Sequence, residues 1–100
     1  MYLILWEFHP APGREAEFER AYAPTGDWAR FFASDPAYRG TELLRDAGNP
    51  RRFLTLDRWS TREAFEAFEK REAAGYRELD ARLAALCASE APIGAFTTPP

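Results

Sequence analysis

Apolar residues fill the start of the chain almost without interruption. Residues 2–8 are nearly all aromatic or branched and include neither Gly nor Pro, which is typical of a β-strand, and the Pro and Gly of residues 9–13 predict the turn that ends it. Side chains alternate between the two faces of a strand, so Leu3 and Leu5 share one face and the other apolar residues share the opposite one. A strand that is apolar on both faces is expected inside a sheet that is covered on both sides.

Helical spacing of apolar residues follows this turn. Between residues 14 and 22 the charged and apolar positions interleave, so that the apolar ones fall on one helical stripe. Pro24 and Gly26 interrupt the pattern, because a proline inside a helix clashes with the preceding turn. Asp27 is suited to cap a second short helix, whose apolar stripe lies within residues 28–32. We therefore predict a helix in two pieces.

Two strands around a turn are predicted next. Residues 40–46 are compatible with an extended conformation, and residues 52–59 have the composition of a clear strand. Between them, the Ala, Gly, Asn and Pro of residues 47–50 have the chemistry of a turn. This arrangement predicts a β-hairpin.

A long helix and a last strand complete the pattern. Ser60 and Glu63 have the spacing of a capping box, in which each side chain bonds the other residue's amide. From there one continuous helix is predicted to about Cys87, with Gly75 as its weak point. Residues 91–96 are poor strand formers, but they are the only segment left to pair with the sheet. The stripe of the predicted helix consists of Phe65, Phe68, Glu72, Tyr76, Leu79, Leu83 and Leu86.

The order of the predicted elements defines a fold class. Strand, helix, strand, strand, helix, strand is the ferredoxin-like βαββαβ pattern, an α+β fold with a four-stranded antiparallel sheet and helices on one face. We expect a single domain over residues 1–97 and a frayed tail at residues 98–100. The face without helices would expose Leu3, Leu5 and part of residues 53–59, an apolar patch that soluble monomers rarely show. We therefore predict a homodimer through the open sheet face.

Composition narrows the classes of function. The chain has 100 residues, enough for one domain and too few for a separate cofactor-binding module. With 13 Lys and Arg against 16 Asp and Glu, no basic surface for nucleic acid is expected. A single cysteine excludes an internal disulfide and a multi-thiolate metal site. No apolar run approaches the roughly 20 residues of a membrane span, and no signal peptide is indicated, so we expect a cytoplasmic protein without a membrane partner.

Several segments together resemble one family. Residues 2–8, 12–19 and 54–61 with Phe65 are similar to the antibiotic biosynthesis monooxygenase domain, and residues 26–29 and 38–44 are similar to one branch of it. The resemblance covers nearly the whole chain and implies a dimeric α/β barrel. Members of this family include cofactor-free oxygenases of aromatic polyketides, haem-degrading enzymes and proteins without a known reaction, so it defines the fold better than the chemistry.

The haem-degrading branch can be compared position by position. That branch has an Asn on its first strand, a Trp on its second helix and a haem-ligating His ten residues later. Counted from Trp59, those helix positions hold Phe68 and Glu78 here, and the first strand has no Asn. The haem motif is therefore missing, and we predict that the protein uses no cofactor and no metal.

Candidate catalytic residues are few. His9 is the one side chain whose unperturbed pKa lies near neutrality, so it is a candidate general base, although a His at the end of a strand is also a common edge residue. Asp57 is a second candidate base, and Arg58 is a candidate donor to an anionic intermediate. Neighbouring strand residues face opposite ways, so at most one of Asp57 and Arg58 points into any one cavity.

Aromatic residues are candidates for binding a substrate. They would lie between sheet and helices, where they form either a plain core or the wall of a pocket for a flat ligand. The candidates are Trp6, Tyr22, Trp28, Phe31, Tyr38, Trp59 and Phe65.

Two functions remain open on this basis. The first is a cofactor-independent monooxygenase that oxidises a flat phenolic, polyketide or quinone-type compound, as the resemblance implies. The alternative is a dimer of the same fold that binds a small hydrophobic or aromatic metabolite without catalysis, or acts as a stress-linked accessory protein.

Overall fold

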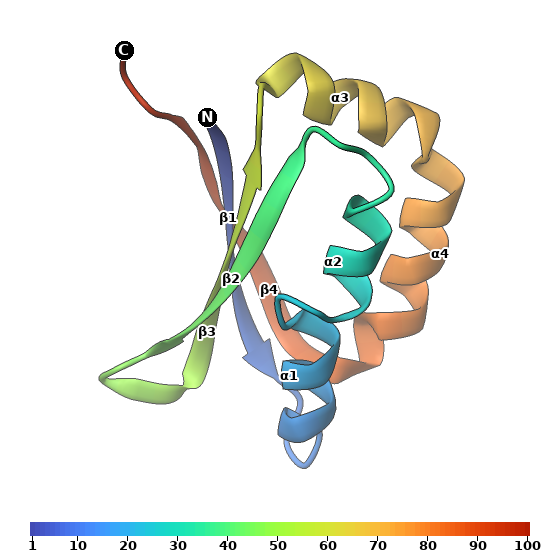
Figure 1. The fold of residues 1–100 in the computed structure, drawn as a ribbon. Helices are drawn as coiled ribbons and strands as arrows, with labels where there is room; N and C mark the ends of the chain where they lie inside the picture. Colours follow the sequence, from blue (N-terminus) through green and yellow to red (C-terminus); the bar gives the residue numbers. More distant parts are fainter.

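One antiparallel sheet carries all the helices on one of its faces (Figure 1). The computed structural model describes residues 1–100, and its strands are in the order β2-β3-β1-β4, which is the order of the ferredoxin-like α+β fold. The predicted fold class is confirmed. The elements are β1 (Tyr2–Pro10), α1 (Glu15–Tyr22), α2 (Asp27–Phe32), β2 (Tyr38–Asp46), β3 (Asn49–Trp59), α3 (Arg62–Arg71), α4 (Ala73–Leu83), the short 3₁₀ helix η1 (Ala84–Leu86) and β4 (Cys87–Thr97).

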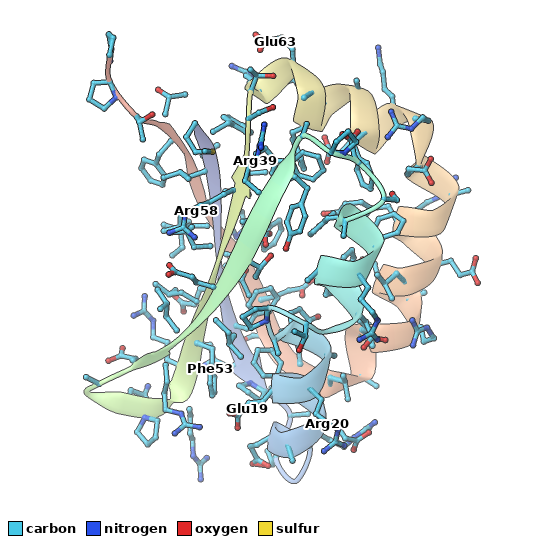
Figure 2. The ribbon with its side chains drawn as sticks, in the orientation of Figure 1. Glu19, Arg20, Arg39, Phe53, Arg58 and Glu63 are labelled. Carbon is cyan, nitrogen blue, oxygen red and sulfur yellow. The ribbon has the colours of Figure 1, made fainter.

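Strand register decides which residues face the helices. Tyr2 of β1 is opposite Trp59 of β3, and Phe8 is opposite Phe53, so alternate residues of both strands share the helical face. Phe53 lies between the sheet and α1, where its ring is 5.1 Å from that of Phe18 (Figure 2). Trp59 and Phe18 are fully buried. The helical face is therefore an aromatic layer.

The two-piece helix forms around a close approach at Gly26. A Cβ atom at Gly26 would lie 2.3 Å from the carbonyl oxygen of Arg20 and 2.4 Å from that of Ala21, so only glycine fits between α1 and α2. Gly26, and not Asp27, is the N-cap of α2, which corrects the predicted cap. The Asp27 carboxylate instead pairs with Arg82 at 3.1 Å, and this links α2 to α4.

The start of α3 also differs from the prediction. The amide of Ser60 donates to the carbonyl of Ala37 at 2.8 Å, so it is not free to meet the Glu63 side chain of a capping box. The helix begins one residue later, where Thr61 is the N-cap and its hydroxyl accepts from the amide of Ala64 at 3.1 Å.

The predicted long helix is in fact two helices. The backbone leaves helical geometry at Glu72, which is the one charged member of the predicted stripe, and not at Gly75. A Cβ atom at Gly75 would lie 3.1 Å from the Phe31 ring, so this glycine allows α4 to pack closely on α2. Cys87 is the first residue of β4 rather than a helical residue, and β4 is longer than residues 91–96. Fraying of residues 98–100 stays a prediction.

Candidate active site

A pocket of about 320 Å³ opens between the helical face of the sheet and the helices. This volume is at the lower end of the range of about 300–1,000 Å³ that is typical of small-molecule sites. Nine of its 15 lining residues are hydrophobic, and none is Arg, Lys or His. The lining residues are Tyr2, Ile4, Trp6, Phe8, Tyr22, Trp28, Phe32, Thr41, Thr55, Asp57, Phe65, Glu69, Tyr76, Asp80 and Glu90.

The sheet supplies the floor of the pocket. Asp57 of β3 is paired with Ile4 of β1 on one side and with Thr41 of β2 on the other. Trp6 and Thr55 form the next pair along the same face. A row of alternating apolar and polar side chains is thus placed by strand register, which holds it more rigidly than a loop would.

Asp57 is the polar centre of this floor. Its Oδ1 accepts a hydrogen bond from the Thr41 hydroxyl at 2.5 Å, and the Tyr38 hydroxyl lies 2.5 Å from the same Thr41 oxygen. Because Thr41 donates to Asp57, Tyr38 must donate to Thr41. The second carboxylate oxygen, Oδ2, has no hydrogen-bond partner in the chain, and no cation pairs with this residue. Burial raises the pKa of Asp57 to about 6, against the lowering effect of the Thr41 hydrogen bond.

The helices supply the aromatic roof. Tyr76 of α4 packs against Trp28 of α2 with 5.0 Å between ring centroids. The indole Nε1 of Trp28 is buried without a hydrogen bond of good geometry, although it lies close enough to the Tyr22 hydroxyl to oppose the rise in the pKa of that phenol. The Tyr76 hydroxyl takes part in no hydrogen bond within the chain. Burial raises the pKa of the Tyr76 phenol, and so does repulsion from nearby carboxylates, so this group stays protonated at neutral pH. A ligand in the pocket would therefore meet unoccupied donors.

Carboxylates from three elements border the mouth of the pocket. Glu69 belongs to α3, Asp80 to α4 and Glu90 to β4, and all three are exposed. Partial burial raises the pKa of Glu69 and of Glu90, and the Asp80 carboxylate adds to the effect on Glu90. No three acidic, His or Cys side chains come together closely enough to hold a metal ion.

Most of the predicted binding residues meet at this pocket, but three lie elsewhere. Trp6, Tyr22, Trp28 and Phe65 line it, as does the candidate base Asp57. The other three belong to the surrounding packing, with Trp59 fully buried, and they are Phe31, Tyr38 and Trp59. Tyr38 still contacts the site indirectly, through the hydroxyl of Thr41.

The other two candidate catalytic residues lie on the opposite face of the sheet. Arg58 points away from the helices and pairs with Glu42 at 3.1 Å (Figure 2). His9 Nε2 lies 3.0 Å from Glu7 Oε2, and Glu7 also binds Arg52. Both His9 and Arg58 are therefore separated from the pocket by the sheet itself.

Sequence reasoning missed several lining residues. The helical spacing assigns Tyr76 to the core stripe rather than to a binding site. Glu90, which also lines the pocket, precedes the strand that is predicted to begin at residue 91. Thr41 is the one polar residue of β2 that faces Asp57, a relation that depends on the register of the hairpin. The buried face of β2 and the true start of β4 are the signals that would have found them.

The fold and the pocket together define a small α+β protein with a mainly aromatic pocket beneath its helices. A family model described as "Antibiotic biosynthesis monooxygenase" matches residues 1–75, and the chain belongs to this family. No helix has the length and apolar character needed to cross a membrane.

Several solved structures share the fold of this chain. SnoaB from Streptomyces nogalater, described as a cofactor-independent oxygenase, is 25% identical in a mutant form, with a TM-score of 0.77 over 97% of this chain and 91% of SnoaB. PA3566 from Pseudomonas aeruginosa is 17% identical, with a TM-score of 0.67 over 99% and 94% of the two chains. Rv0793 from Mycobacterium tuberculosis is 15% identical, with a TM-score of 0.70 over 99% and 95%. No curated protein matches the chain.

Proposed function

We propose that this protein is a cofactor-independent monooxygenase that oxidises a flat aromatic compound of the polyketide or quinone type, with Asp57 as its general base. The observation that carries the proposal is the Asp57 carboxylate at the floor of a pocket with mainly aromatic walls, with one oxygen left free. Membership of the monooxygenase family and the likeness to SnoaB, a cofactor-independent oxygenase, support the reaction class.

The surroundings of Asp57 suit proton abstraction. A general base works best when its pKa is close to the operating pH, and burial brings the pKa of this carboxyl to about 6. The hydrogen bond from Thr41 occupies Oδ1, which leaves Oδ2 free to accept a proton from a substrate. Removing a proton from an activated carbon of the substrate gives a delocalised carbanion that can react with O₂ directly.

The reaction balances without a further reductant. An activated CH₂ group loses one proton to Asp57, and the carbanion combines with O₂ to form a peroxide anion. The proton returns from Asp57 to give a hydroperoxide, which loses water, so that CH₂ and O₂ become C=O and H₂O. Trp28 Nε1 and the Tyr76 hydroxyl are the donors available to the oxygen atoms that gain negative charge. Aromatic walls exclude water from the intermediate.

Turnover of anthrone, a flat tricyclic compound with such a CH₂ group, tests the proposal. Purified protein is incubated with anthrone and O₂, and anthraquinone formation and O₂ uptake are followed above the uncatalysed rate. We expect Asp57→Asn to lower kcat by roughly 10²–10⁴-fold, the usual contribution of a general base. Glu78→Gln is the matched control, because it removes one exposed carboxylate of α4 outside the pocket. Saturable binding without turnover would instead favour a metabolite-binding protein without catalysis.

We also propose that two chains associate through the open face of the sheet. Leu56 faces Leu5 there, Leu54 faces Leu44, and the Leu44 and Phe96 side chains at the margins are 43% and 49% exposed. An apolar band of this kind is rarely left to water. A two-fold contact would cover it without blocking the pocket, which lies on the other face. Light scattering at micromolar concentration tests this, and a monomeric mass would contradict it.

A further inference from the structure

We infer that the ligand of this pocket is a cation, specifically a flat aromatic compound that carries a protonated or quaternary amine. The inference rests on the proposed function and specifies its substrate class. Two independent features support it, namely the charge of the groups that border the pocket and the chemistry of its walls.

Every ionisable side chain with a charge at this pocket is acidic. Asp57 lies on the floor, and Glu69, Asp80 and Glu90 lie at the mouth. None of the four takes part in any ion pair of the chain, although nine of the 16 acidic residues do. The pocket therefore has a negative potential that the protein itself leaves uncompensated.

The four carboxylates act on a common region. The pKa of the Tyr76 phenol is raised by burial and then by Glu69, Asp57, Asp80 and Glu90, so all four carboxylates lie close enough to affect it. The Tyr76 ring forms part of the roof and packs on Trp28. An ammonium group beside Tyr76 would thus be near several carboxylates at once.

The aromatic walls of the pocket also favour a positively charged ligand. The face of an aromatic ring carries partial negative charge and attracts cations, most strongly at Trp and then at Tyr. Trp6, Trp28 and Tyr76 all line the pocket. An aromatic enclosure that is bordered by carboxylates is the arrangement by which proteins recognise alkylammonium groups. A ligand whose anionic group lies near the mouth would be repelled by the carboxylates there.

The Asp57 carboxylate on the floor supports a positively charged ligand independently of the three carboxylates at the mouth. This largely buried carboxylate keeps Oδ2 without any donor from the chain, inside the pocket. No cation of the chain neutralises this carboxylate, so a positive charge on the ligand near the mouth would compensate it while Oδ2 stays free to act as the base. A divalent metal does not explain the groups, because no three of them are placed to bind one.

Three ligands that share one ring system test the inference. They are naphthalen-2-ylmethylammonium, 2-naphthylmethanol and 2-naphthoate, and their binding to the full chain is measured by calorimetry. We expect the cation to bind at least about fivefold more tightly than the alcohol, and the anion to bind most weakly. Raising the salt from about 10 mM to about 1 M should reduce the advantage of the cation, because the carboxylates at the mouth are exposed and are screened by salt.

Charge-removing variants locate the effect. Glu69→Gln combined with Glu90→Gln should remove most of the advantage of the cation while the alcohol binds within about twofold of its original affinity. Asp80→Asn alone should give a smaller loss in the same direction, so the test does not depend on the double variant folding. The control Glu78→Gln, an exposed α4 carboxylate outside the pocket, should change neither affinity.

The other outcomes distinguish failure of the inference from failure of the proposed function. Equal affinity for the three ligands, or tighter binding of the anion, would refute the inference and leave the proposed oxygenase intact, provided that anthrone is still turned over. A cation advantage that persists in both variants would also refute it. Failure of all three ligands to bind, together with no turnover of anthrone, would refute the inference and the proposed function together.

Discussion

Replacing Asp57 by Asn should make the protein more stable at neutral pH while it removes activity. The carboxylate of Asp57 is charged at neutral pH in a place where burial disfavours charge, since its pKa is raised from 3.8 to about 6. A neutral amide of nearly the same shape keeps an oxygen that can accept from Thr41, and it removes the unfavourable charge.

The size of the effect follows from linkage between proton binding and folding. A difference of about two pH units between folded and unfolded pKa values corresponds to about 3 kcal/mol at most. Because the folded pKa is the higher one, the folded state binds the proton more tightly, and the free energy of unfolding falls as pH rises from about 4 to about 6. Above that range the destabilisation is constant, and below about pH 4 it is absent.

Chemical denaturation of wild type and Asp57→Asn across this pH range measures the difference. We expect the variant to be more stable by about 1–3 kcal/mol at pH 7.5 and equal to the wild type near pH 4. One protein concentration must be used throughout, because the stability of the proposed dimer would depend on it. Glu78→Gln removes the same charge from an exposed site and is the control. A variant that is less stable than the wild type at pH 7.5, or a gain that is the same at every pH, would refute the reasoning.

Three further changes probe the fold and the proposed assembly. Thr61→Ala should lower the free energy of unfolding by about 1 kcal/mol, because it removes the N-cap of α3. Ser60→Ala is the control and should change the free energy by less than about 0.5 kcal/mol. Equal effects of the two variants in urea denaturation would instead indicate that Ser60 is the cap. Gly26→Ala should destabilise by about 1–3 kcal/mol, seen as a lower Tm by circular dichroism, because its Cβ has no room beside the carbonyls of α1. Leu56→Lys should give a monomer in light scattering with its helices intact, and an unchanged mass would argue against association through this face.

The sequence predicted the order of the elements because each strand and helix has its own spacing of apolar residues. It placed Asp57 and Arg58 on opposite faces of β3, and the structure agrees, with Asp57 in the pocket and Arg58 paired to Glu42 on the other side. The local pattern alone did not indicate which of these two residues points toward the helices. That choice depends on pairing with β1, where Asp57 stands opposite Ile4 and Arg58 opposite Leu3.

The ends of the helices were predicted less well, because they also depend on contacts with residues that are distant in the sequence. Ser60 has a suitable side chain and spacing for a cap, but its amide is bound by the carbonyl of Ala37, a residue 23 positions earlier in the chain. The break at Glu72 rather than Gly75 likewise reflects contacts with another element, since Gly75 is needed for the approach of Phe31. Tertiary contacts thus override local preference where two helices meet.

Polar groups without a partner in the chain lie either in the pocket or in the packing beside it. Trp28 Nε1 and Trp59 Nε1 are the buried side-chain atoms without a hydrogen-bond partner, and the Trp59 ring lies 5.3 Å from that of Phe65, which lines the pocket. Asp57, with its free oxygen, lies in the same pocket. Each such group costs stability, and natural sequences retain these costs where function requires them. The helical face thus carries donors and a carboxylate without partners, whereas on the open face the charges are paired with one another beside a band of leucines. This difference supports a ligand role for the first face and assembly for the second.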